Sequence, residues 1–169
     1  MTIAEAIQTA IEYEKKVRDV YVKSRQEAGN DVGKRVFGIL AKEEQHHVDY
    51  LQQKLQELES TGSVSSDDLA SILPSAEAIA AAATTLERKL EADDQGREVA
   101  MLRQAFQVEV ETSEFYQRMA KELDREGRAF FARFLDIEEA HVALVRSEID
   151  VLTGTGFWFD MQEFNLESG

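Results

Sequence analysis

Carboxylate and imidazole side chains recur at a fixed interval in both halves of the chain. Glu43 and His46 are three residues apart, and so are Glu138 and His141. Residues three apart in a helix lie on one face, so each pair presents a carboxylate and an imidazole in the same direction. One Glu-x-x-His pair is common by chance, whereas two copies in one chain are a stronger signal. Such side chains are suitable ligands for iron, manganese or zinc.

A glutamate and a tyrosine seven residues apart precede each pair. Seven residues are two turns of a helix, so this glutamate and tyrosine also share a face. The two halves of the chain therefore follow one design, which predicts two helical hairpins related by a pseudo-two-fold axis. A gapless shift of 95 residues pairs Glu14 with Glu109, Tyr21 with Tyr116, Glu43 with Glu138 and His46 with His141.

A second frame exists in the first half, because His47 lies three residues after Glu44. The shift of 95 residues aligns His47 with Val142, which favours a surface or supporting role for His47. Five further glutamates are interpreted as charges on helix surfaces: Glu12, Glu44, Glu111, Glu114 and Glu139.

Apolar residues at helical spacing predict the elements that position these side chains. The helices are expected at about residues 2–28, 31–58, 98–123 and 128–152, with Gly127 in the last turn and a further Ala-rich helix from Ser75. A two-fold axis between hairpins makes the second and third helices parallel, so the segment of about 60–97 must cross back along the bundle. The fold class predicted is all-α: a four-helix bundle with one long crossover.

The bundle is predicted to occupy residues 1–152 and an extended tail residues 153–169. In the tail, Phe157, Phe159 and Met161 alternate with other residues and are expected to pack on the bundle or on a neighbouring subunit. The apolar tail and the Ala-rich helix together suggest a homodimer.

The composition of the chain excludes or disfavours several classes of protein. The 169 residues carry a net charge of −14 and contain no Cys. Thiolate metal sites and disulfides are therefore excluded, and nucleic-acid binding is disfavoured because it needs Lys and Arg to neutralise phosphates. No apolar run is long enough for a membrane span, and the first residues do not read as a secretory signal. We expect a cytoplasmic protein of one domain.

Charge balance predicts the number of metal ions. Four glutamates pointing into a bundle core would repel one another and would be costly to remove from water. Without metal, some would have a raised pKa and would bind protons. Two divalent cations balance four carboxylates, and shared glutamates can hold two metals about 3.5–4 Å apart.

This pattern resembles the ferritin-like di-iron carboxylate family, and the rubrerythrins most closely. The resemblance covers the four helices but not the crossover or the tail, and it implies a ferritin-like bundle with two iron ions, manganese or zinc being possible. It implies that Tyr21 and Tyr116 hydrogen-bond the ligand carboxylates. It further implies that Glu14 and His46 are terminal ligands of one ion, Glu109 and His141 of the other, and that Glu43 and Glu138 bridge the two.

The chain departs from the rubrerythrins in two respects. It has no Cys with which to bind a rubredoxin-type iron, and Thr112 stands where rubrerythrins have an extra carboxylate. Glu111 could supply that carboxylate only through a local bulge. Three functions are compatible: reduction of peroxide or dioxygen with an external electron-donor protein, iron handling by Fe(II) oxidation, or a static metal pair in a structural bundle.

Overall fold

The computed structural model describes residues 1–65, 71 and 96–155. All regular structure in these residues is helical: α1 (Ile3–Glu27), α2 (Asp31–Thr61), α4 (Gly96–Glu122) and α5 (Arg125–Thr155). Three predicted features lie outside the described residues: most of the crossover, the Ala-rich helix from Ser75, and the aromatic tail with Phe157, Phe159 and Met161.

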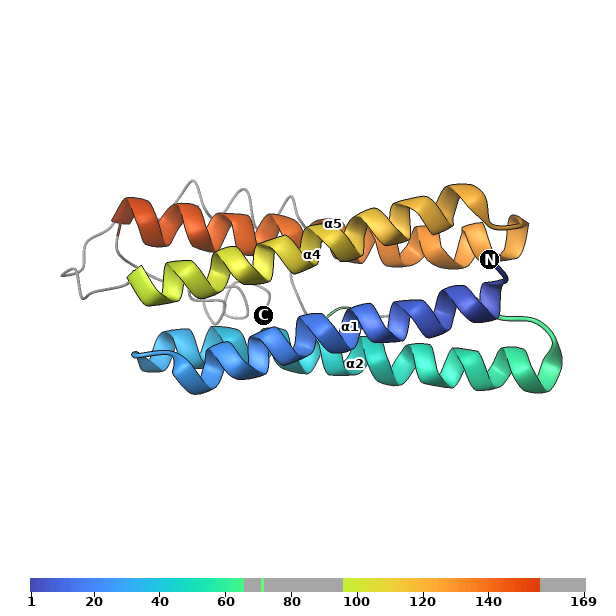
Figure 1. Ribbon diagram of the computed structural model, residues 1–169, viewed down its shortest axis with the longest axis horizontal. Coiled ribbons are helices and arrows are strands. Elements are labelled where there is room, and N and C mark those ends of the chain that lie inside the picture. The colour runs from blue at the N-terminus through green and yellow to red at the C-terminus, as the bar shows by residue number, and fades with distance from the viewer. Residues whose placement is uncertain (66–70, 72–95, 156–169) are drawn as a thin grey trace, which may run out of the picture.

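The helices form two antiparallel hairpins that pack against each other (Figure 1). One hairpin consists of α1 and α2, the other of α4 and α5, and their turns lie at opposite ends of the bundle. Consequently α1 runs antiparallel to its neighbour α4, while α2 and α4 run in the same direction. The all-α, four-helix bundle predicted from the internal repeat is confirmed for the described residues.

Local hydrogen bonds explain where the first two helices begin and end. At the start of α1, the Thr2 backbone N–H donates to Glu5 Oε2 at 2.7 Å, and the Glu5 N–H donates to Thr2 Oγ1 at 3.2 Å. This capping box satisfies two donors that the first helical turn leaves free. The side chain of Asn30 caps α2, and Gly62 ends it with φ of 78°, a left-handed conformation that favours glycine.

The last helix is longer at both ends than its sequence pattern predicts. It begins at Arg125 because Asp124 Oδ1 accepts a 2.8 Å hydrogen bond from the Gly127 N–H, so Gly127 lies in the helix and not in the turn. A Cβ atom at Gly127 would lie within 2.9 Å of the Leu123 side chain, which explains the glycine there. The helix then continues to Thr155, past residue 153, where the tail was expected to start.

The interior of the bundle is divided into three parts along its axis. An apolar cluster fills each end: Tyr21, Phe37, Leu40, Leu102 and Leu144 belong to one, and Ile7, Leu51, Phe115, Tyr116 and Phe131 to the other. Most of the buried polar residues, including Glu14, Glu44, Glu109 and Glu138, lie in the middle of the bundle, at positions that fall between these two clusters on each helix. In the described residues, no helix combines the length and apolar composition that a bilayer span requires.

Candidate metal centre

Six side chains meet in the polar middle of the bundle, and each is fully shielded from solvent. One comes from α1, one from α4, and a pair three residues apart from each of α2 and α5. They are Glu14, Glu44, His47, Glu109, Glu138 and His141, each with an exposed fraction of 0%. A bundle core is normally apolar, so six ionisable groups at its centre need a compensating partner.

The two imidazole rings lie at the centre of this group. The rings of His47 and His141 stack with their centroids 5.1 Å apart and their planes 9° from parallel. Glu44 lies between them: its Oε2 is 3.2 Å from His47 Nδ1, and its Oε1 is 2.9 Å from His141 Nδ1. Glu138 Oε1 is also placed between the rings, 3.7 Å from His47 Nδ1 and 3.9 Å from His141 Nδ1. Glu44 and Glu138 are thus shared by both halves.

Each of the two remaining glutamates of the cluster lies close to one imidazole ring. Glu14 Oε2 is 3.3 Å from His47 Nδ1, and Glu109 Oε2 is 3.9 Å from His141 Nδ1. The arrangement therefore has two equivalent halves, each with its own imidazole and its own carboxylate, around two shared carboxylates.

The structure brings together four of the six predicted ligands and replaces the other two. Glu14, Glu109, Glu138 and His141 lie in the cluster as predicted, but His46 is exposed on the outer face of α2. Its place is taken by His47, and the shared position expected of Glu43 is taken by Glu44. Of the two possible Glu-x-x-His pairs on α2, it is Glu44 and His47 whose side chains point into the bundle.

The length of one turn explains this correction. Three residues, 28–30, separate α1 from α2, whereas two residues, 123–124, separate α4 from α5. The interval between equivalent residues is 95 before the turn and 94 after it, as the pairs Glu14–Glu109 and His47–His141 show. A gapless alignment across the turn therefore selects residues one position too early on α2.

The α2 sequence carried a signal for this frame. Residues 40, 44, 47 and 51 follow one another at intervals of four, three and four, which places Glu44 and His47 between the buried Leu40 and Leu51. His46 falls instead between Lys42 and Asp49, both exposed. Helical phase within α2 was thus better evidence than similarity to the other hairpin.

The two tyrosines connect the hairpins through hydrogen bonds to cluster carboxylates. The Tyr21 hydroxyl on α1 donates to Glu109 Oε1 on α4, and the Tyr116 hydroxyl on α4 donates to Glu14 Oε1 on α1. Burial, followed by the negative charge of the bonded glutamate, raises the pKa of both phenols well above 10.0, so both remain donors. These contacts match the positions expected for Tyr21 and Tyr116.

The other acidic candidates lie outside the cluster. Glu111 does not enter it: its side chain is 40% exposed and pairs with Lys16 on α1 at 2.6 Å. The adjacent Thr112 is buried, and its hydroxyl donates to the Val108 carbonyl at 2.9 Å. Helix α4 is therefore regular here and supplies one carboxylate, Glu109.

Three of the buried carboxyl groups retain their protons to higher pH than an ordinary glutamate. Burial raises the pKa of Glu14 to about 7, although its hydrogen bond with His47 acts in the opposite direction. Burial, and then the charge of Glu44, raises the pKa of Glu109 to about 8. Burial and the nearby Glu14 and Glu109 raise the pKa of Glu138 well above 4.5.

Glu44 and the two imidazoles show the opposite balance between burial and charge. Burial acts to raise the pKa of Glu44, but the charges of His141 and His47 hold it well below its usual range. Burial acts to lower the pKa of each imidazole, but Glu44 raises both above 6.5. Without a cation, protons therefore neutralise most of the charge in this cluster.

The metal-free protein is expected to lose stability as the pH rises from 5 to 8. In this range the folded cluster binds more protons than the unfolded chain, because the pKa values of Glu14, Glu109 and Glu138 exceed 4.5. This contribution is complete below about pH 4.5 and is lost as the pH passes the folded values of about 7 and 8. The melting temperature should fall by more than ~5 °C, at roughly 2–4 °C per kcal/mol. A melting temperature that is constant or rises, measured by circular dichroism on chelator-treated protein, would contradict this expectation.

Unpartnered atoms show that the cluster is suited to a cation. Within the described part of the chain, buried atoms that make no hydrogen bond include both carboxylate oxygens of Glu44 and Glu138, one of Glu109, and ring nitrogens of both histidines. One ligand atom from each of Glu44, His47, Glu138 and His141 lies within 4.8 Å of the others. Buried polar groups without partners are costly, and coordination of a metal ion would satisfy them. This buried group could therefore hold a metal ion.

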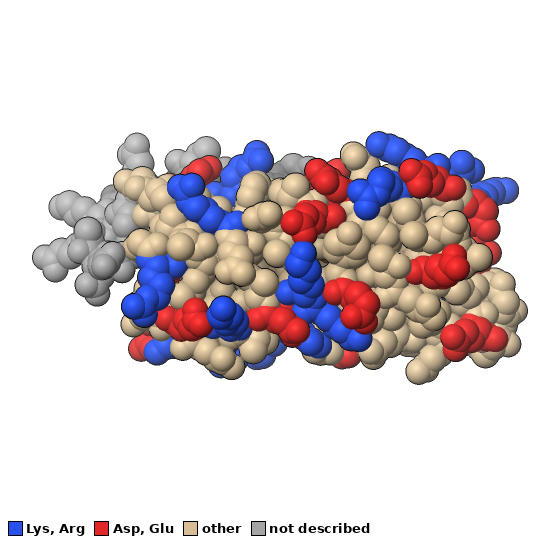
Figure 2. Space-filling view, in the orientation of Figure 1, with Lys and Arg blue, Asp and Glu red and all other residues tan. Residues whose placement is uncertain are grey.

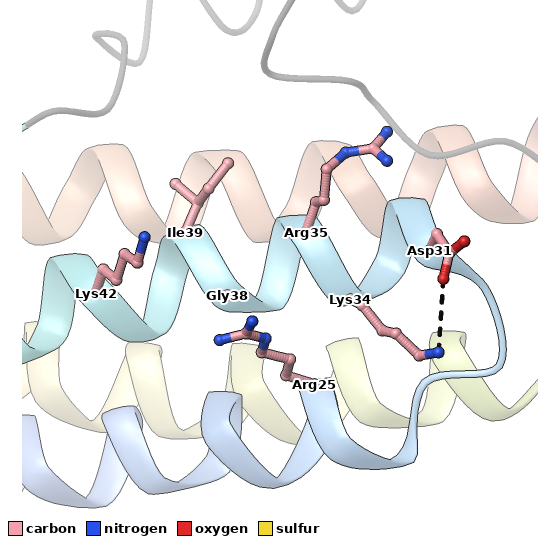
Figure 3. A pocket seen from close by; sticks show the side chains of 7 residues that line it. All are labelled: Arg25, Asp31, Lys34, Arg35, Gly38, Ile39 and Lys42. Atoms are coloured by element: carbon pink, nitrogen blue, oxygen red, sulfur yellow. Dashed lines mark ion pairs between the residues drawn. The ribbon is translucent and has the colours of Figure 1, made fainter.

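The surface offers no comparable donor set among the described residues. Figure 2 shows charges of both signs interspersed over one face of the bundle. A hollow of about 400 Å³ lies beside the first turns of α2 (Figure 3). Its charged residues are Arg25, Lys34, Arg35 and Lys42 with one acid, Asp31, so it would repel a cation.

Comparison of the chain with protein-family models, with curated proteins and with solved structures finds no match in any of the three.

Proposed function

We propose that this protein is a di-iron oxidoreductase of the ferritin-like type, which reduces peroxide or dioxygen with electrons from a separate donor protein. The observation that carries the proposal is the symmetric group of six buried carboxylate and imidazole side chains, several of whose atoms lack partners. A Glu from each of two helices and a Glu-x-x-His pair from each of the other two is the ligand plan of ferritin-like di-iron bundles.

The distances suggest how the ligands divide between two ions. Glu14 and His47 would serve one ion, and Glu109 and His141 the other, while Glu44 and Glu138 would be shared. The four carboxylates would balance the charge of two divalent cations. Mixed carboxylate and imidazole ligation suits iron, manganese or zinc, and the family resemblance favours iron among them.

Two Fe(II) ions held there would supply two electrons which, with two protons, reduce hydrogen peroxide to two molecules of water. Tyr21 and Tyr116 would keep Glu109 and Glu14 oriented through their hydrogen bonds as the charge nearby changes. The apolar clusters on either side would exclude bulk water. Because the 169 residues contain no Cys, they cannot bind a thiolate-ligated relay iron, so electrons would have to come from another molecule.

Protein loaded with Fe(II) under anaerobic conditions is expected to contain close to two iron ions per chain. It should consume peroxide repeatedly when a reductase and a rubredoxin are added, and stop after about one oxidation of the site when they are omitted. Elemental analysis and a peroxide electrode measure these two quantities. Fewer than half an equivalent of iron would contradict the metal pair.

The same preparation separates this proposal from iron handling. A protein that handles iron would oxidise excess Fe(II) far beyond two ions per chain without any donor and would release Fe(III). Stopped-flow absorbance with excess Fe(II) detects that behaviour. If it is observed, the oxidoreductase proposal is wrong and iron handling takes its place.

A further inference from the structure

Glu43 breaks the symmetry of the metal centre. Every cluster residue on α2 has its counterpart on α5 at an interval of 94: Glu44 with Glu138, and His47 with His141. At the same interval, the counterpart of Glu43 is Ile137. Both residues are buried, with exposed fractions of 1% and 8%. One half of the centre therefore has an additional carboxylate where the other half has a hydrocarbon side chain.

This carboxylate lies behind the His47 ring. His47 turns its Nδ1 toward the cluster, 3.2 Å from Glu44 and 3.3 Å from Glu14, so that Nε2 is the nitrogen on the outer side. Glu43 Oε1 is 3.9 Å from this Nε2 and accepts a 2.5 Å hydrogen bond from the Ser71 hydroxyl. Neither His47 Nε2 nor His141 Nε2 makes a hydrogen bond among the described residues, and at the position equivalent to Glu43 the other half has Ile137 in place of a carboxylate.

The position of Glu43 beside Nε2 matters because of the tautomer that His47 needs in order to bind a metal. An imidazole that binds a cation through Nδ1 carries its proton on Nε2, and a buried N–H needs an acceptor. A carboxylate acceptor fixes the ring orientation and makes the ring a stronger donor to the metal. Glu43 Oε1, 3.9 Å from Nε2, is a carboxylate oxygen on that side of the His47 ring, whereas Ile137 has no acceptor.

We propose that Glu43 is a positioning residue for His47 and that it makes the metal position of Glu14 and His47 the tighter of the two. The inference rests on the proposed metal pair and adds that the two ions are bound unequally. It also gives Ser71 a role, because its hydroxyl holds the Glu43 carboxylate from the segment that follows α2.

Single-position variants allow each half to be measured alone. His141→Ala retains the position of Glu14 and His47, and His47→Ala retains the position of Glu109 and His141. Co²⁺ is the probe, and its dissociation constant is measured by competition with a chelator of known affinity. The His141→Ala protein is expected to bind Co²⁺ at least ~10-fold more tightly than the His47→Ala protein, the lower limit for an outer hydrogen-bond partner.

Glu43→Leu is then introduced into both backgrounds. It should weaken Co²⁺ binding about 10–100-fold in His141→Ala, and change it less than ~3-fold in His47→Ala. If the leucine variant does not fold, Glu43→Gln replaces it. Glutamine preserves the size of the side chain and an acceptor oxygen, so Glu43→Gln should weaken Co²⁺ binding less than Glu43→Leu in the His141→Ala background. Circular dichroism checks the fold of each protein.

A reciprocal substitution provides the matched control. Ile137→Glu places a carboxylate behind His141, and in the His47→Ala background it should strengthen Co²⁺ binding. Equal losses from Glu43→Leu in both backgrounds would mean that Glu43 only supports the fold, and no loss in either would mean that it does not act on His47. Either result overturns the inference, whereas an absence of Co²⁺ binding by the unsubstituted protein overturns the proposed metal pair itself.

Discussion

His47→Ala is expected to remove one of the two metal ions, whereas His46→Ala leaves both in place. His47 is fully buried with Nδ1 within 3.3 Å of Glu14 and Glu44, while the neighbouring His46 side chain faces solvent. Loss of a direct ligand should weaken the binding of one ion by more than ~100-fold, which exceeds the effect typical of losing an outer hydrogen-bond partner. Elemental analysis after desalting should give about one ion per chain for His47→Ala and about two for His46→Ala.

The two variants control for each other, because they make the same substitution at adjacent positions of one helix. His46→Ala should also have little effect on stability. Without metal, its melting temperature should lie within about 1 °C of that of the parent protein, as is usual for surface substitutions. If His46→Ala loses metal and His47→Ala retains it, the helical phase assigned to α2 is wrong.

Glu138→Leu is expected to abolish binding of both ions and at the same time to stabilise the metal-free protein. Glu138 lies between the two imidazoles, so its loss affects both positions. Among the described residues, neither of its carboxyl oxygens has a hydrogen-bond partner, although Glu138 is fully buried. An unsatisfied buried polar group costs about 1–3 kcal/mol, and leucine of similar volume removes that cost.

Chemical denaturation of the metal-free proteins measures the free energy of unfolding, and Co²⁺ titration measures binding. Glu139→Leu is the matched control, because Glu139 is the adjacent residue and is exposed. It should change neither quantity appreciably. A Glu138→Leu protein that is less stable without metal than the parent would show that the carboxyl group supports the fold by itself.

The internal repeat was sufficient to predict the arrangement of the helices. Matching Glu14 with Glu109 and Tyr21 with Tyr116 requires two hairpins of one design, and their symmetry dictates which helices run antiparallel. The tyrosine hydrogen bonds follow from the same symmetry, because each hydroxyl reaches the carboxylate of the opposite hairpin. Residues on the two helices that begin the hairpins needed no correction.

The residues that α2 contributes to the buried cluster could not be identified from the repeat alone. Similarity between the halves does not reveal where a gap belongs, and one residue of turn length changes the partner of His141 from His46 to His47. The role proposed for Glu43 could not be predicted from the repeat either. That proposal depends on the lack of a carboxylate at the equivalent position, which is Ile137, and this equivalence is seen only when the interval of 94 is used.

The unequal turns also determine where the gene can gain or lose a codon without harm. Each residue of an α-helix advances the chain by about 100° around its axis. One codon inserted within α2 ahead of Glu44 would swing the side chains on one side of the insertion out of the core. Removal of one codon among residues 28–30 leaves the phase within each helix intact, and it gives this turn the two-residue length of the turn between α4 and α5. The turns therefore absorb changes in length that the helices cannot.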